Sequence, residues 1–224
     1  MSVRPAAGGG RWVDVDPARL SRWIDGFAAR HGAPQTTPQP YGVRLLAPDG
    51  ATAELHAPPG APPEGDLPGF ITAAAAPRRL GLLLARKSAV AVGVIDGDQL
   101  IESKVETRYV QARTAAGGWS QQRFARRRDN QTKAAAGRAV DLVARLLLPY
   151  AETLTSLVCG GDRRTIEAIL ADRRLAPLVA LRSDRLLDVP EPRHAVLVAA
   201  IPAARAVRIL VRDPQPDGAG DDAA

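Results

Sequence analysis

The chain has 224 residues, of which 46% are hydrophobic, 24% charged and only 4% aromatic. This length accommodates one large domain or two small ones, and either can bury a core without a disulfide or a metal. The single cysteine, Cys159, excludes an internal disulfide and a thiolate metal cage. The three histidines lie far apart in the sequence, so we expect neither a metal site nor another cofactor.

The N-terminal residues contain no apolar segment typical of a signal peptide. The longest charge-free apolar run near the C-terminus, residues 195–204, is too short to span a bilayer. Together with the lone cysteine, these features predict a cytoplasmic protein that makes no contact with a membrane.

The N-terminal part is predicted to contain one helix and one hairpin. Apolar residues at helical spacing between Leu20 and Phe27 follow a helix start at Asp16-Pro17. Two short strands are expected over residues 41–46 and 51–56, because a Pro-Asp-Gly turn sequence separates them.

Composition divides the chain into three parts. Residues 58–68 are rich in proline, glycine and acidic residues and are interpreted as a linker. We therefore expect an N-terminal helix and hairpin unit with its linker over residues 1–70, and a second domain over residues 71–213. The acidic residues 214–224 are predicted to be a disordered tail.

The second domain is predicted to begin with an antiparallel meander. Apolar and alternating runs indicate strands over residues 80–85, 88–95 and 100–110. A loop follows, and then a long helix from about residue 122 to 148, closed by Pro149.

The remainder of this domain is predicted to alternate strands and helices. The expected order is a strand over 154–159, a helix over 162–171 capped by Asp162, a strand near 178–181 or 186–189, a helix over 192–203 and a strand over 206–211. The fold class is therefore α/β, or α+β, with a mixed sheet and flanking helices.

Positive charge is concentrated in one window of the sequence. Nine of the 30 basic residues lie between Lys104 and Arg138, against only Glu106 and Asp129, so this window has a net charge of +7. The rest of the chain therefore sums to −1. A local patch of this kind indicates a polyanionic partner at one place.

Within this window, a Gly-Gly loop and an arginine cluster lie between the predicted strand and the long helix. Two glycines permit a close backbone approach to a partner, and guanidinium groups bind phosphate in a bidentate manner. Taken singly, the glycines also suit an ordinary turn and the arginines a solvated helix face. Their order favours RNA binding, with these candidate residues: Arg113, Arg123, Arg126, Arg127, Arg128, Lys133 and Arg138.

The loop reads Gly117-Gly118-Trp119-Ser120-Gln121-Gln122. In this strand–loop–helix context it resembles the catalytic domain of eukaryotic and archaeal class-one release factors, as carried by Vms-like release factors and their short actinobacterial relatives, the Vms-like peptidyl-tRNA hydrolases. The resemblance extends in pattern from about Leu80 to Val211. Release factors have Gly-Gly-Gln here, and the Vms-like ones Gly-Gly-Ser-Gln or a near variant. Trp119 is an additional residue, so the Ser-Gln pair corresponds best to Ser120 and Gln121, with Gln122 as the alternative.

The resemblance implies a release-factor-like fold and hydrolysis of the ester that joins a nascent peptide to tRNA. The catalytic loop would comprise Gly117, Gly118, Ser120 and Gln121 or Gln122, with a glutamine positioning water. The implied partners are the large ribosomal subunit, its ribosomal RNA and peptidyl-tRNA, and we expect a monomer. The length leaves no room for the further domains of stop-codon readers, so we expect release on stalled or split ribosomes.

Two alternatives remain open. The same domain could cut the acceptor end of the tRNA, as an endonuclease in ribosome quality control. The basic patch alone could also serve a non-catalytic ribosome-binding or RNA-binding module.

Overall fold

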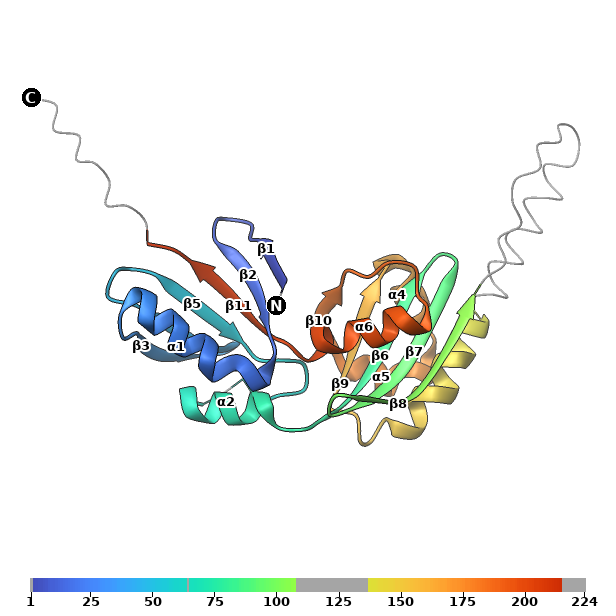
Figure 1. Ribbon diagram of the computed structural model, residues 1–224. Helices are drawn as coiled ribbons and strands as arrows, with labels where there is room; N and C mark the ends of the chain where they lie inside the picture. The colour runs from blue at the N-terminus through green and yellow to red at the C-terminus, as the bar shows by residue number, and fades with distance from the viewer. Residues whose placement is uncertain (1, 64, 108–136, 215–224) are drawn as a thin grey trace, which may run out of the picture. The chain divides into compact units, whose positions relative to one another are not determined.

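A computed structural model describes residues 2–63, 65–107 and 137–214 of the chain (Figure 1). The chain forms two compact units, and each is described by itself. The first unit comprises Met1–Ala76 together with Arg205–Ala224, and the second comprises Pro77–Ala204. The second unit is therefore inserted, in sequence, between the two pieces of the first.

The first unit contains a six-stranded sheet, sheet A, with the strand order β1-β2-β11-β5-β4-β3 and only antiparallel neighbours. Its strands are β1 (Ser2–Pro5), β2 (Arg11–Val15), β3 (Gln35–Gln39), β4 (Gly42–Leu46), β5 (Thr52–His56) and β11 (Val207–Arg212). The helices α1 (Leu20–His31) and α2 (Leu67–Ala75) bury their apolar residues against one face of this sheet.

Local sequence explains the start of α1 and the β4–β5 hairpin. The Asp16 carboxylate accepts a hydrogen bond from the Ala18 amide at 2.9 Å and caps a short 3-10 turn, Pro17–Arg19, that leads into α1. In the hairpin, the Asp49 carboxylate accepts one from the Ala51 amide at 2.9 Å, and Gly50 adopts a positive φ of 88°. The helix and the hairpin predicted from the sequence are both confirmed.

The second unit contains a five-stranded mixed sheet, sheet B, with the order β10-β9-β6-β7-β8. Its strands are β6 (Arg79–Arg86), β7 (Ala89–Asp96), β8 (Gln99–Thr107), β9 (Ser156–Gly161) and β10 (Arg182–Leu187). Strands β10, β9 and β6 are parallel, whereas β7 is antiparallel to both β6 and β8. The predicted meander is thus confirmed as β6–β7–β8.

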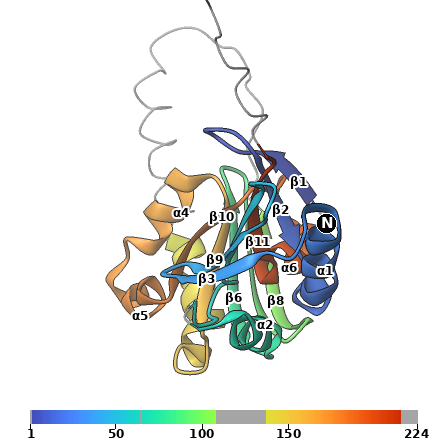
Figure 2. The ribbon, with the colours of Figure 1, turned by 90° about the vertical axis from the view of Figure 1, so that its left-hand side faces the viewer.

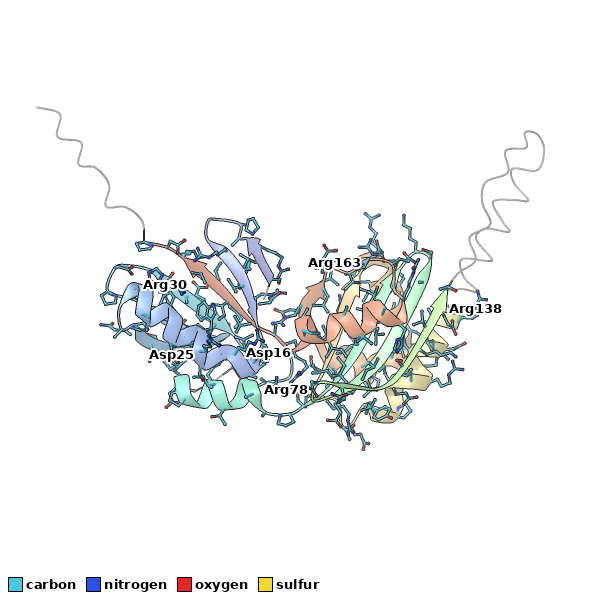
Figure 3. All side chains as sticks on the ribbon, in the orientation of Figure 1. Asp16, Asp25, Arg30, Arg78, Arg138 and Arg163 are labelled. Carbon is cyan, nitrogen blue, oxygen red and sulfur yellow. The ribbon has the colours of Figure 1, made fainter. Side chains whose placement is uncertain are left out.

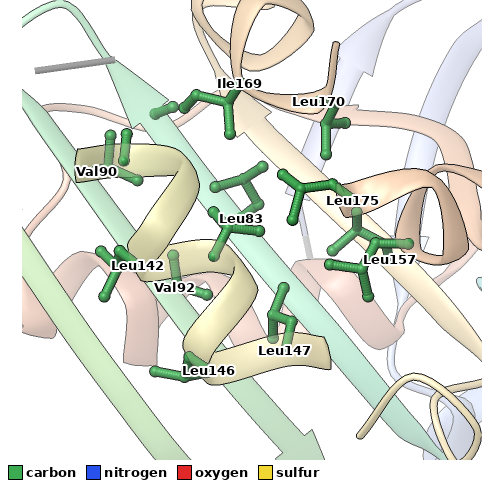
Figure 4. Close-up of a cluster of buried hydrophobic side chains, with 14 of the residues drawn as sticks. Leu83, Val90, Val92, Leu142, Leu146, Leu147, Leu157, Ile169, Leu170 and Leu175 are labelled. Carbon is green, nitrogen blue, oxygen red and sulfur yellow. The ribbon is translucent and has the colours of Figure 1, made fainter. Parts of the chain in front are cut away.

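Helices cover both faces of sheet B, as Figure 2 shows. A helix over residues 137–147, α4 (Arg163–Leu170) and α5 (Ala176–Ala180) pack on one face, and α6 (His194–Arg205) packs on the other. Figure 4 shows the first of these two cores, where Leu142 and Leu146 of the helix meet Val92 and Leu83 of the sheet. The second unit is therefore a three-layer α/β/α domain, which confirms the predicted fold class.

The last strand is assigned differently by the structure and by the sequence. The sequence predicts that residues 206–211 complete the second domain, but β11 lies in sheet A between β2 and β5. Val207, Ile209 and Val211 point into the core beneath α1 and α2. In the structure the residues from Arg205 onward belong to the first unit, which is therefore discontinuous, whereas the sequence groups residues 71–213 as one domain.

Three smaller differences concern local structure. The sequence leaves two positions open for one strand. The first, residues 178–181, lies mostly in α5, because Pro177 favours a helix start and Leu178 is buried. The second, residues 186–189, overlaps the end of β10. The expected linker over 58–68 ends in α2, whose first turn is capped by Asp66. Of the long helix expected over 122–148, the part described is 137–147, and the tail from residue 215 lies outside the described residues.

Candidate functional site

The carboxyl-terminal edge of sheet B brings together the ends of four strands. The parallel strands β6, β9 and β10 end there, and β8 ends there too because it has the same direction as β6. Thr107, the last residue of β8, pairs with Ala89, the first residue of β7. The helix over 137–147 also begins here, and Figure 4 shows Val90 beside its first turn. The described chain therefore stops at Thr107 and resumes at residue 137 on one edge of the sheet.

Most residues of the predicted site fall between these two points. The predicted catalytic residues Gly117, Gly118, Ser120, Gln121 and Gln122 lie outside the described residues. The same is true of six predicted RNA-binding residues: Arg113, Arg123, Arg126, Arg127, Arg128 and Lys133. The seventh, Arg138, is exposed in the first turn of the helix over 137–147 (Figure 3).

The edge carries further cations that the sequence pattern did not single out. Lys87 lies in the β6–β7 turn, and Arg163 and Arg164 begin α4. All three are exposed, as is Arg138, and none of the four forms an ion pair with a carboxylate of the described residues. As far as the described residues go, these side chains are available to bind an external anion. The signal that could have found them is the position of each at the carboxyl end of a predicted strand.

Arg86 has a different role at the same edge. Its Nε donates a hydrogen bond to the Val189 carbonyl at 2.8 Å, and its guanidinium lies 3.6 Å from the Asp188 carboxylate. Beside it, the Ser88 hydroxyl donates to the Glu191 carboxylate. These contacts hold the β6–β7 turn against the segment that follows β10, so they fix the edge on which the exposed cations stand.

Asp162 is the acidic residue at the start of α4, and its carboxylate caps that helix. It accepts hydrogen bonds from the Thr165 amide at 2.7 Å and the Thr165 hydroxyl at 2.8 Å. These hydrogen bonds, with smaller contributions from Lys87 and Arg164, hold the pKa of Asp162 below its usual value. The carboxylate is thus a helix cap, as the sequence predicts, and is engaged in that contact.

The two glycines before Asp162 lie where the chain is closely packed, against backbone at Gly161 and against side chains at Gly160. Gly161 has a positive φ of 97°, and a Cβ at this position would lie 2.3 Å from the Ala85 carbonyl oxygen of β6. At Gly160 a Cβ would lie 2.8 Å from a methyl carbon of Leu84. Close contact between β9 and β6 therefore explains this Gly-Gly pair.

Gly161→Ala is expected to lower the free energy of unfolding by more than the ~1–2 kcal/mol that a left-handed backbone costs a non-glycine residue, since the clash adds to it. Gly97→Ala is the matched control, because Gly97 also has a positive φ, 58°, but no atom lies within 4 Å of the place that a Cβ would take there. Urea unfolding of both variants measures the difference. Equal losses for the two would contradict the packing argument.

Other nucleophilic or metal-binding groups of the described residues are engaged elsewhere. Cys159 is buried in β9, and burial raises the pKa of its thiol to about 11, so it remains protonated at neutral pH. The His31 ring nitrogen lies 2.8 Å from the Asp49 carboxylate in the first unit. Across residues 2–63, 65–107 and 137–214, no three potential metal ligands are grouped together. Within the same residues, no helix has the length and apolar character needed to cross a membrane.

Comparison with known proteins gives a family match for one part of the chain. The family model described as "Actinobacteria/chloroflexi VLRF1 release factor" matches residues 78–210, which cover the second unit and most of β11. No curated protein matches the sequence.

Two solved structures are similar to the chain at low identity. One, the crystal structure of archaeal translation termination factor aRF1, shares 16% identity at a TM-score of 0.41, over 79% of this chain and 50% of that chain. The other, described as "Archaeal protein", shares 15% identity at a TM-score of 0.41, over 70% of this chain and 48% of that one. The chain thus spans about half the length of these two archaeal proteins.

Proposed function

The chain belongs to the actinobacterial and chloroflexal VLRF1 release-factor family, and we propose from this membership that it hydrolyses peptidyl-tRNA on the large ribosomal subunit. The observation that carries the proposal is the family match over residues 78–210, which includes the sequence Gly117 to Gln122. We further propose that it works as a cytoplasmic monomer on stalled or split ribosomes.

The electrostatics of the second unit support a ribosomal partner. The window from Lys104 to Arg138 has a net charge of +7, and the described chain on either side of residues 108–136 ends at the edge where Lys87, Arg163 and Arg164 are exposed. Cations gathered in this way bind the phosphates of RNA, and the binding weakens as salt concentration rises. The RNA of the large ribosomal subunit carries the opposite charge and is therefore a suitable partner.

The proposed reaction needs little from the protein beyond positioning. A water oxygen attacks the carbonyl carbon of the ester, and the bond from that carbon to the tRNA oxygen breaks. The proton that the water loses is taken up by this leaving oxygen, which becomes the tRNA hydroxyl. The amide of Gln121 can orient the water and donate a hydrogen bond to the oxyanion, while remaining neutral in a phosphate-rich site. Gln122 is the alternative, because Trp119 shifts the motif by one residue.

The test uses purified large subunits that carry a peptidyl-tRNA labelled on both the peptide and the tRNA. Wild-type protein is expected to release the peptide and leave the tRNA with an intact CCA end. A shortened tRNA would replace the proposal by endonucleolytic cleavage of the acceptor end. Binding to the subunit without any product would replace it by a non-catalytic binding module.

A further inference from the structure

The first unit has a sheet face that its two helices do not use. Residues directly opposite one another on neighbouring antiparallel strands share a face, so the register of sheet A defines this surface. The helices α1 and α2 pack on the other face, as the buried core and Figure 1 show. We call the surface opposite them the open face; its central residues are Arg4, Trp12, Asp14, Gly42, Arg44, Glu54, His56, Arg208, Leu210 and Arg212.

Three aromatic rings form a row across the open face. The Trp12 ring lies edge-on to the His56 ring at 5.1 Å, and Tyr41, which precedes β4, stacks on His56 at 4.3 Å. Each of the three residues is partly exposed. Gly42 is the residue opposite His56 on the neighbouring strand, and a Cβ there would lie 2.8 Å from the Phe70 ring of the core. A Cβ on Gly42 would lie 2.1 Å from the Leu55 carbonyl oxygen, so this position is closed to other residues.

Arginine side chains lie on the same face as these rings, and one of them contacts the Trp12 ring. The Arg208 guanidinium lies over the Trp12 ring at 5.9 Å from its centroid and 3.6 Å from the Asp14 carboxylate. Arg4 contacts the same carboxylate at 3.3 Å, and Arg212 lies 2.8 Å from Glu54.

The open face therefore has an excess of positive charge. With Arg44, which is exposed, four arginines face two carboxylates. Both carboxylates hold arginine side chains in place, and the four arginines with the two carboxylates leave a net charge of +2 on the face.

We propose that the open face of sheet A binds single-stranded RNA, with bases stacking on Trp12 and Tyr41 and phosphates contacting the arginines. Aromatic rings on a sheet stack unpaired bases, and adjacent cations follow the backbone. A duplex keeps its bases stacked on each other and does not offer them to the rings. An acidic peptide would satisfy the arginines but would leave the aromatic row without a partner. The face lies in the part of the chain that the family match largely leaves out, and the inference does not rest on the proposed hydrolysis.

The test measures binding of a fluorescein-labelled U12 oligonucleotide to the full-length chain by fluorescence anisotropy. All proteins carry Arg126→Gln, Arg127→Gln and Arg128→Gln, so that the basic segment of the second unit contributes less. Trp12→Leu is expected to raise the Kd about 5- to 100-fold, which corresponds to loss of one base–aromatic stack. Trp12→Phe keeps an aromatic ring and is expected to restore most of the affinity; an unchanged unfolding temperature in Trp12→Leu would separate loss of base stacking from loss of structure.

The matched control removes one arginine charge from the open face and, in a second variant, one from helix α1. Arg208→Gln on the open face is expected to weaken U12 binding, whereas Arg22→Gln on the exposed side of α1 removes the same charge and is expected to leave it unchanged. Thermal unfolding of each variant identifies any that fails to fold. If the Trp12→Leu variant does not fold, the U12 affinities of the Tyr41→Leu and Tyr41→Phe variants are compared in its place.

Photocrosslinking of the wild-type chain gives an independent readout. A U12 probe containing 4-thiouridine is expected to crosslink to peptides that contain Trp12 or Tyr41. Crosslinks confined to the second unit and residues 108–136 would overturn the proposal. The proposal would also be overturned if the Trp12→Leu and Arg208→Gln variants bound U12 with the same Kd as the Arg22→Gln variant. Competition by a 12-base-pair RNA duplex or a polyglutamate peptide at the same concentration as unlabelled U12 would overturn it as well.

Discussion

Gln121→Ala is expected to slow peptide release by about 10²- to 10³-fold, the effect of removing one donor that stabilises an oxyanion. Binding to the large subunit is expected to remain, because the substitution removes an uncharged side chain and leaves the basic residues intact. The measurement is the rate of peptide release from saturated large subunits, together with cosedimentation of the variant.

Gln122→Ala is the matched control for this prediction, since it removes the same amide one residue further on. Full activity in Gln122→Ala and loss in Gln121→Ala would assign the water-positioning role to Gln121. The reverse pattern would assign it to Gln122 and place Trp119 and Ser120 in a longer loop. Release at the wild-type rate in both variants would contradict the proposed mechanism.

Replacing Arg126, Arg127 and Arg128 together by glutamine is expected to weaken binding to the large subunit and to reduce its salt dependence. Each lost phosphate contact lowers the slope of log K against log salt by roughly 0.7–0.9, so three contacts lower it by about 2–3. The measurement is the affinity for large subunits at a series of potassium chloride concentrations.

A second triple variant controls for net charge. Arg19, Arg22 and Arg30 are exposed at or near α1, and their replacement by glutamine changes the charge by the same amount. That variant is expected to retain both the affinity and the slope of the wild type. A slope unchanged in the Arg126–Arg128 variant would show that these residues do not contact phosphates.

Elements with strong local signals could be predicted from the sequence. The hairpin of β4 and β5 has its turn chemistry in the residues Pro48 to Gly50. Helix α1 has one apolar face and follows a 3-10 turn that is capped by Asp16. The meander β6–β7–β8 consists of apolar runs separated by short turns. In each case the information lies within about twenty residues, which is the range over which periodicity and turn signals act.

Elements that depend on distant partners could not be predicted in this way. Strand β11 is recognisable as a strand, but nothing within residues 207–212 indicates that it pairs with β2 and β5 rather than with β9 or β10. At α5, the apolar run after Pro177 suits either a strand or a short helix, and packing of Leu178 into the core selects the helix. Tertiary contacts decide both cases.

The candidate site likewise has one part that could be predicted from local sequence and one part that could not. The glutamine loop and the basic window are contiguous in sequence, so they could be recognised there. Lys87, Arg163 and Arg164 come from two other segments, and only the parallel register of β6 and β9 brings their segments to one edge. The sequence therefore indicates the chemistry of residues 117–122, whereas the sheet topology is needed to find the cations at the carboxyl-terminal edge of sheet B.

The place of β11 also has a consequence for the order in which the chain folds during its own synthesis. Strands β2 and β5 emerge from the ribosome before the second unit, but β11, which lies between them in the sheet, emerges after it. Until then each presents an unpaired edge, whereas sheet B has all of its strands once β10 has been made. The second unit can therefore fold before the first is complete. A nascent chain interrupted before residue 207 leaves β2 and β5 with unpaired edges that can template aggregation, so synthesis of β11 is the step that closes sheet A.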